Sequence, residues 1–307
     1  MGREGELQLQ LTDSMARFGK IPQSKKIALL ESAYYDLYKE LSSRMLSLEP
    51  GSYTEAEGMS LLRKSKDMIA DLNRFVVTWS RSVIPTAYDE AQGIAFKRLK
   101  SLGAEKDPRF KDKAHTKAKT KETDTMIDDM LKANASIEKN VGMYIYLVRK
   151  AAKRLTRLEA FLGDLRDEKV VAGLIDKAAK EGQSRGKIEQ LIRMHFKRRL
   201  YERKWINING REYDLIKYAR LVARTRLRIV QTEAVKNECK EYDNDLIEIS
   251  NHGTVCDECK EFEGNVYSIS GKTPGYDQIP EWPPYHPNCE HHAMPTSAEA
   301  IEWRRSA

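Results

Sequence analysis

The chain has 307 residues, 32% of them charged, and its formal net charge is +7. A mean hydropathy of −0.64 favours long helices with solvated faces over a single large core. No apolar run approaches the roughly 20 residues of a membrane span, and no apolar stretch follows the N-terminus as in a secretory signal. We therefore expect a soluble protein that is made and used in a cytoplasm, with no membrane partner.

The N-terminal third of the chain has the apolar spacing of long helices. Residues 25–47 and 54–84 each place apolar side chains three or four positions apart, and a capping-box sequence begins at Thr54. Because proline lacks the amide hydrogen that continues a helix, we expect Pro85 to end the second helix. A further helix is expected over residues 86–102.

Charge is distributed unevenly along the chain. Residues 97–121 hold ten Lys or Arg and three Asp or Glu, whereas residues 238–307 hold fourteen acidic and five basic residues. Within the basic part, residues 103–122 contain Gly103 and Pro108 and lack apolar periodicity. We interpret this stretch as a basic linker or loop.

A long helical pattern resumes at residue 123 and carries more basic residues near position 150, and a shorter helix is expected over 186–204. A basic body favours contact with a polyanion, and double-stranded DNA bound without sequence preference is the obvious one. The alternative is that these side chains only solvate the faces of long helices. The residues that we assign to DNA contact are Lys111, Lys113, Lys117, Lys119, Lys121, Arg149, Lys150, Lys153 and Arg154.

The pattern changes after residue 204. Residues 205–213 predict a β-hairpin, because Asn209-Gly210 is a favoured two-residue turn between strands. A helix over 214–240 follows, and residues 246–250 and 266–271 alternate as strands do.

These elements predict a mainly α protein, with a long-helix N-terminal region followed by a small α+β C-terminal domain. The expected parts are a helical region 1–102, a basic linker or loop 103–122, a long-helix region 123–204 and an α+β domain 205–307.

A cluster of cysteine and histidine residues lies in the C-terminal domain. Zinc takes four nitrogen or sulfur ligands, commonly as two pairs on tight turns. Cys256 and Cys259 supply one pair, and the second comes from His286, Cys289 and His291. Our first choice of ligands is Cys256, Cys259, His286 and Cys289, with His291 as the alternative fourth ligand. Such a full set favours a structural Zn²⁺ that staples the domain over a catalytic ion with an open position.

Residues 206–295 resemble the phage Mu F-like head-morphogenesis domain and the related phage minor capsid protein 2 family. Glu290 stands where the family usually has arginine, so the role of that arginine is in doubt here, while the expected metal ligands are retained. The segments that carry the resemblance are 210–213, 218–225, 245–252, Cys256 to Cys259, 264–271 and 286–291.

The resemblance implies a non-enzymatic minor head protein of a tailed bacteriophage. Such a protein is expected to associate with the portal protein and the packaged genome, and to act in head morphogenesis and in genome packaging or ejection. Scaffold and major capsid proteins are further expected partners. The implied location is the interior of the virion head, after assembly in the host cytoplasm.

Two other classes of function stay open at the sequence level. One is an enzyme, either an ADP-ribosyltransferase-like domain that uses Arg224, Ser268 and Ser270 with a later glutamate, or a zinc hydrolase. The other is a host-derived zinc protein that binds nucleic acid, although the fragment lacks the base-reading helix of a zinc finger.

Overall fold

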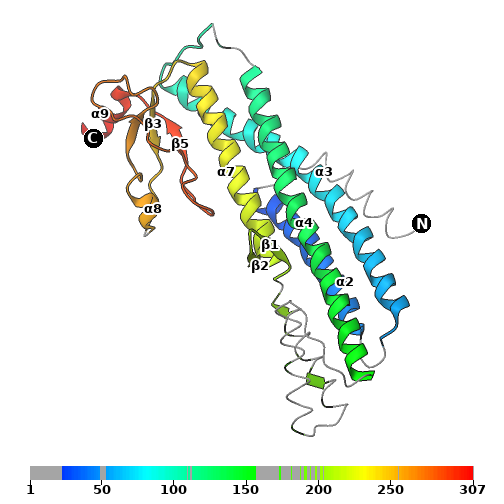
Figure 1. The fold of residues 1–307 in the computed structure, drawn as a ribbon. Helices are drawn as coiled ribbons and strands as arrows, with labels where there is room; N and C mark the ends of the chain where they lie inside the picture. Colours follow the sequence, from blue (N-terminus) through cyan, green and yellow to red (C-terminus); the bar gives the residue numbers. More distant parts are fainter. Residues whose placement is uncertain are drawn as a thin grey trace. The chain divides into compact units, whose positions relative to one another are not determined.

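The computed structural model describes residues 23–48, 53–108, 110, 113–156, 204–254 and 256–306, together with scattered positions between 157 and 203. The described chain is mainly helical, and its strands are short and lie in the C-terminal third (Figure 1). The helices are α2 (Gln23–Ser47), α3 (Glu55–Ser101), α4 (Lys113–Thr156), α7 (Leu215–Glu241), α8 (Asp257–Lys260) and α9 (Ala298–Ser306). The strands are β1 (Ile206–Ile208), β2 (Arg211–Tyr213), β3 (Leu246–Ile249), β4 (Val266–Ser268) and β5 (Ala293–Pro295).

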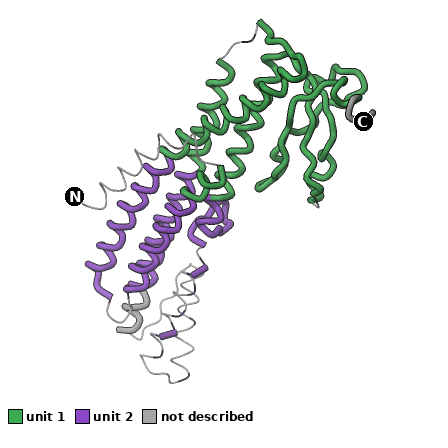
Figure 2. Tube along the Cα trace, turned by 180° about the vertical axis from the view of Figure 1, so that it is seen from behind, with its two compact units in different colours: residues 1–29, 77–129, 220–307 green, residues 30–76, 130–219 purple. Residues whose placement is uncertain are grey.

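The chain divides into two compact units, each assembled from separate stretches of sequence (Figure 2). Unit 1 comprises Met1–Leu29, Val77–Asp129 and Arg220–Ala307, and unit 2 comprises Leu30–Val76 and Met130–Ala219. The sequence pattern predicts regions that are consecutive along the chain, with a boundary at residue 205. The long helices instead contribute one part of their length to each unit, which apolar periodicity within a single helix does not reveal.

Unit 2 is built on the apolar faces of α2, α3 and α4. Tyr34 is fully buried, and its hydroxyl donates to the Asn134 side chain at 2.6 Å. The Asn134 amide in turn donates to Asn73 at 2.7 Å, which satisfies a buried polar group inside the helix packing. The buried apolar residues of these helices include Leu30, Leu37, Leu41, Leu72, Val76, Met130, Ile137 and Val141.

Unit 1 contains the three-stranded sheet, whose strand order is β4-β3-β5 with both pairs antiparallel. The sheet packs on α7 and on part of α3. Its core consists of Ala95, Val235, Cys239, Ile247, Ile249, Phe262, Ile279 and Ala293. The strands 246–250 and 266–271 expected from alternation are confirmed as the shorter β3 and β4. The edge strand β5 was not expected, because it is three residues long and ends in proline.

The expectation that Pro85 ends a helix is wrong, because α3 runs without a break to Ser101. An interior proline costs roughly 3 kcal/mol of helix stability. Here Ile84 and Tyr88 next to it are fully buried, and burial of one such side chain contributes about 1.5–3 kcal/mol. The hydroxyl of Thr86 also donates to the backbone oxygen of Ser82 at 2.7 Å, which supplies that carbonyl with a partner near the interruption. The capping box at Thr54 is confirmed, since its side chain and that of Glu57 each bind the other's backbone amide.

The basic stretch 103–122 is not one loop. Residues 104–107 have no regular structure, whereas α4 begins at Lys113, ten residues before the predicted start of the long helix. The reason is tertiary, because His115, Glu122 and Thr123 face the interior and are buried despite their polarity. The expected helix over 186–204 lies mostly outside the described residues.

Two predictions in the C-terminal third are confirmed in detail. β1 and β2 form the expected hairpin, with Ile208 opposite Arg211, and both Asn209 and Gly210 have positive φ as the turn requires. The helix predicted over 214–240 is α7, and the Asp214 side chain accepts from the first amides of the helix at Ile216 and Lys217.

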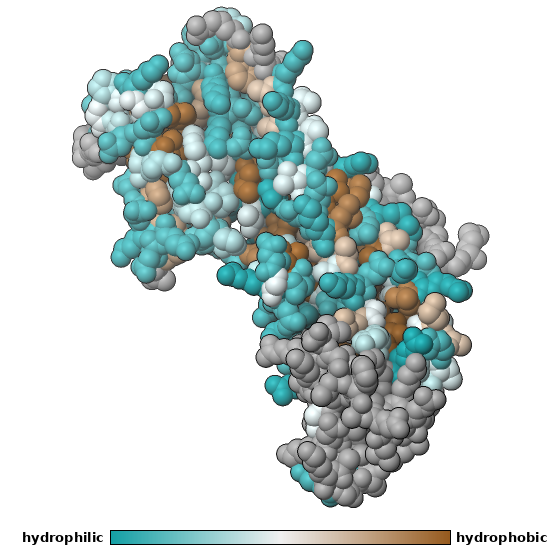
Figure 3. All heavy atoms as spheres, in the orientation of Figure 1, coloured by the Kyte–Doolittle hydropathy of each residue, from teal (hydrophilic) through white to brown (hydrophobic). Residues whose placement is uncertain are grey.

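The surface agrees with the composition. Hydrophilic side chains cover most of the face shown in Figure 3, and apolar ones appear there in small separate areas. None of the helices in the described ranges is long and apolar enough to cross a bilayer.

Candidate metal centre

The sheet of unit 1 brings the two halves of the Cys/His cluster together. β3 is the central strand, and the chain that leaves its C-terminal end carries Cys256 and Cys259. β5 runs antiparallel to β3, with Ile249 opposite Ala293. The segment that enters β5, which carries the remaining cysteine and histidines, therefore arrives at the same end of β3.

Each half of the cluster is a tight turn. The backbone oxygen of Cys256 accepts from the amides of Cys259 and Lys260, at 3.3 and 3.0 Å, as α8 begins. In the second turn the amide of Cys289 donates to the backbone oxygen of His286 at 3.1 Å, and Asn288 between them has φ 69°. These turns bring the donor atoms of the two halves close to each other.

The donor atoms have the spacing of ligands around one ion. His286 Nε2 lies 3.3 Å from Cys256 Sγ and 3.4 Å from Cys259 Sγ, and His291 Nδ1 lies 3.6 Å from Cys289 Sγ. In a tetrahedral site with Zn–S near 2.3 Å and Zn–N near 2.0–2.1 Å, sulfur and nitrogen ligands are about 3.5 Å apart. The arrangement therefore fits a zinc ion.

Two groups of three donors overlap at one cysteine. Cys256, Cys259 and His286 form one group, and Cys259, Cys289 and His291 form the other, with all donor atoms of a group within 4.8 Å of each other. All five residues that we selected from the sequence are thus brought together. Cys259 belongs to both groups, whereas the choice of Cys289 or His291 as the fourth ligand stays a prediction.

His291 is oriented by a carboxylate. It is 2% exposed, and its Nε2 lies 3.3 Å from Glu263 Oε1, while Nδ1 faces Cys289. The same carboxylate accepts from the backbone amides of His252 and Thr254. Partial burial alone would raise the pKa of Glu263, but these hydrogen bonds outweigh it and hold that pKa below its usual value. A carboxylate behind a histidine is the usual second layer of a metal site.

His286 is held in a similar way by the main chain. Its Nδ1 lies 2.9 Å from the backbone oxygen of Pro287, which leaves Nε2 directed at the two thiols. Burial and the neighbouring thiols of Cys256 and Cys289 raise the pKa of the Cys259 thiol to about 11. That thiol becomes a thiolate at neutral pH only if a cation such as zinc displaces its proton.

The arrangement offers little to a hydrolase. Glu263 is the carboxylate that contacts the cluster, and it is already engaged by two amides and by His291. Glu258, Glu261 and Glu290 are near in sequence but exposed. A general base at a catalytic zinc needs an open ligand position next to it, so the geometry favours a closed structural site.

The residues considered for an ADP-ribosyltransferase have structural partners. Ser268 is fully buried, and its hydroxyl donates to Asp245, which also accepts from the Ser270 amide. Arg224 lies on an exposed position of α7. These contacts hold the turn after β4.

The basic residues assigned to DNA contact differ in their surroundings. Lys113, Lys117 and Lys121 are exposed on α4 at intervals of four residues, which lines them up on one face of the helix. Lys119 instead pairs with Asp89 at 2.9 Å, and Arg149 in unit 2 pairs with Glu55 at 3.1 Å. Lys111 lies outside the described residues, and Lys150, Lys153 and Arg154 are described only as helical backbone.

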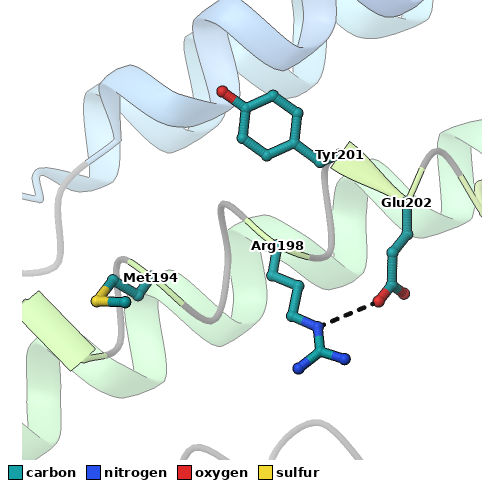
Figure 4. Close-up of a pocket in the computed structure, with 4 residues that line it drawn as sticks. All are labelled: Met194, Arg198, Tyr201 and Glu202. Carbon is teal, nitrogen blue, oxygen red and sulfur yellow. Dashed lines mark hydrogen bonds and ion pairs between the residues drawn. The ribbon is translucent and has the colours of Figure 1, made fainter.

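A surface pocket in unit 2 is lined by none of these residues. It is lined by Met194, Arg198, Tyr201 and Glu202, and Arg198 Nε donates to Glu202 at 3.4 Å (Figure 4). Met194 and Tyr201 are each more than 60% exposed, at 61% and 63%. The hollow is open and includes none of the residues predicted to bind metal.

The structure also contains a second cluster of ionisable side chains, which the sequence pattern does not predict. His115 of α4 and Glu238 and Glu241 of α7 are buried with their ligand atoms within 4.8 Å of each other. Burial raises the pKa of Glu238. It would also raise that of Glu241, but hydrogen bonds from Lys106 and His115 outweigh it and lower this pKa. The available signal was a pair of acidic residues in the last turn of a helix, where the helix dipole disfavours them.

A comparison with known protein families places most of the chain from residue 101 onward in one family. The family model described as phage minor capsid protein 2 matches residues 101–297, which includes α4, α7 and the entire Cys/His cluster. The chain belongs to the phage minor capsid protein 2 family. This family member is thus a structural protein of a bacteriophage head, and the resemblance inferred from residues 206–295 is confirmed over a longer span. No curated protein and no solved structure matches it.

Proposed function

We propose that this minor capsid protein is a non-enzymatic component of the phage head that associates with the portal protein and with packaged double-stranded DNA. In this role it acts in head morphogenesis and in genome packaging or ejection, after assembly in the host cytoplasm. The observation that carries the proposal is the family match over residues 101–297, which spans helices of both units as well as the C-terminal sheet. Scaffold and major capsid proteins are its other proposed partners.

The proposed role of the Cys/His cluster is structural. One Zn²⁺ bound by Cys256, Cys259, His286 and either Cys289 or His291 ties the chain after β3 to the chain before β5. The support is the spacing of 3.3–3.6 Å between sulfur and nitrogen donors and the carboxylate behind His291. The strands of this sheet are only three or four residues long, so a staple compensates for a small core.

The proposed DNA contact rests on charge. An exposed row on α4 consists of Lys113, Lys117 and Lys121. Among the ion pairs of the described residues, the closest acidic side chain to this row is Glu122, which lies 3.6 Å from Lys121. Contact with the phosphate backbone requires no base recognition, so such a row suits non-specific binding to packaged DNA.

Portal association is tested by comparing heads assembled with and without the portal protein. The protein content of purified particles is measured by quantitative mass spectrometry. We expect the minor capsid protein in a few copies per portal-containing head and its near absence from portal-less particles of the same shell. Equal amounts in both kinds of particle would contradict portal association and favour binding to the shell or scaffold.

A further inference from the structure

We propose that His115, Glu238 and Glu241 form a second metal site, which binds a divalent cation through nitrogen and oxygen ligands. The site lies in unit 1, apart in sequence from the Cys/His cluster, and joins the first turns of α4 to the last turns of α7. All three residues are buried, with exposures of 7% for His115, 2% for Glu238 and 6% for Glu241.

The distances suit ligands of a common ion. His115 Nε2 lies 2.8 Å from Glu241 Oε2 and 3.9 Å from Glu238 Oε1. Ligands about 2.1 Å from one ion are about 3.0–3.4 Å apart at angles between 90° and tetrahedral. The two observed separations bracket that range, so small side-chain movements complete the coordination.

The unmatched group is Glu238. Its Oε1 accepts from Gln92 at 2.7 Å, but its Oε2 is buried and has no hydrogen-bond partner within the described parts of the chain. A buried carboxylate oxygen without a partner costs free energy that a bound cation recovers. Both carboxylates lie in the last turns of α7, at the negative end of the helix dipole, which further favours a bound cation there.

The histidine is held for this task by a second layer of hydrogen bonds. His115 Nδ1 is 2.7 Å from the Tyr88 hydroxyl, which itself accepts from the Asn237 amide at 2.8 Å. In the tautomer whose Nδ1–H donates to the phenol oxygen, the Nε2 lone pair faces the carboxylates. Two lone pairs 2.8 Å apart need either a proton or a metal ion between them.

Mn²⁺ distinguishes this site from the Cys/His cluster, because carboxylate and imidazole ligands accept Mn²⁺ whereas thiolates favour zinc. The full chain, purified with zinc present, is titrated with MnCl₂, and free Mn²⁺ is followed by electron paramagnetic resonance. We expect one tightly bound Mn²⁺ per chain. Glu238→Gln and His115→Gln are each expected to weaken binding by on the order of a hundredfold.

Glu122→Gln is the matched control, since Glu122 is an equally buried carboxylate on α4 that faces Arg226. It should retain Mn²⁺ binding. A second measurement needs no variant. Mn²⁺ at a hundred times its Kd should raise the unfolding temperature of the unaltered chain by on the order of 5 °C. No bound Mn²⁺ in the unaltered chain, or undiminished binding in both cluster variants, would overturn the proposal. Either result would mean that the Nε2–H of His115 donates a hydrogen bond to Glu241 instead.

Discussion

At the scale of single residues, Asp245 shows how one carboxylate organises the turn after β4. It accepts from the hydroxyls of Ser268 and Thr273 and from the amide of Ser270. Partial burial would raise the pKa of Asp245, but these hydrogen bonds outweigh it and hold the pKa below its ordinary value. A carboxyl whose pKa falls on folding stabilises the native state above its unfolded pKa, and this contribution is lost as the pH falls through the folded pKa.

Replacement of this carboxylate tests the assignment. Asp245→Asn should lower the free energy of unfolding at pH 7 by about 1 kcal/mol, a modest value because the group is partly exposed to solvent. The difference between the two proteins should begin to shrink below about pH 4, where the carboxyl of the unfolded chain becomes protonated, and should vanish once the pH has fallen through the lower pKa of the native carboxyl. Urea unfolding at pH 7 and pH 3 measures both quantities. A difference that is the same at both values would show that charge plays no part.

Glu263 provides the residue-scale test of the layer behind the proposed zinc. Glu263→Gln keeps the shape of the side chain but loses the charge that orients His291. We expect zinc affinity to fall by about 10–100-fold, measured by competition with a chelator of known affinity. Glu261→Gln is the control, because that neighbouring side chain is exposed. Equal losses in both variants would argue that the effect is general electrostatics.

At the scale of elements, the proposed contact with DNA lies on α4. Changing Lys113, Lys117 and Lys121 together to alanine should reduce the slope of log K against log salt by about three, the number of phosphate contacts removed. The control removes three lysines at other exposed positions, Lys64, Lys132 and Lys139. Fluorescence anisotropy with a duplex of arbitrary sequence measures the slope. Identical slopes in the two variants would show that this row contributes no more than other exposed lysines, and would contradict its assignment to DNA contact.

The sequence predicted elements well wherever local rules and tertiary packing agree. α2, the β1–β2 hairpin, α7 and β3 follow from apolar spacing, a turn dipeptide and strand alternation. It failed at Pro85 and at the start of α4. In both places burial of distant side chains outweighs a local signal, and a single sequence does not show which distant residues meet.

At the scale of the whole molecule, the same limit separates the two clusters. The Cys/His cluster was predictable, because cysteines and histidines at such tight spacing are typical of a metal site. The cluster of His115, Glu238 and Glu241 was not, since His115 lies more than a hundred residues before the two glutamates and all three are common residue types. Nor was the interleaving of the two units, which depends on which lengths of each helix pack together.

The central claim is that a zinc ion staples the C-terminal sheet of this head protein, and metal analysis of purified protein tests it most directly. Zinc content and unfolding temperature are measured for the unaltered chain, for Cys259→Ala and for Cys239→Ala. Cys239 is an equally buried free cysteine that lies in the apolar core and outside both donor groups. The account predicts one zinc ion per chain in the unaltered protein and in Cys239→Ala, and its loss, with a lower unfolding temperature, in Cys259→Ala. Equal zinc in all three proteins, or none in the unaltered chain, would contradict it.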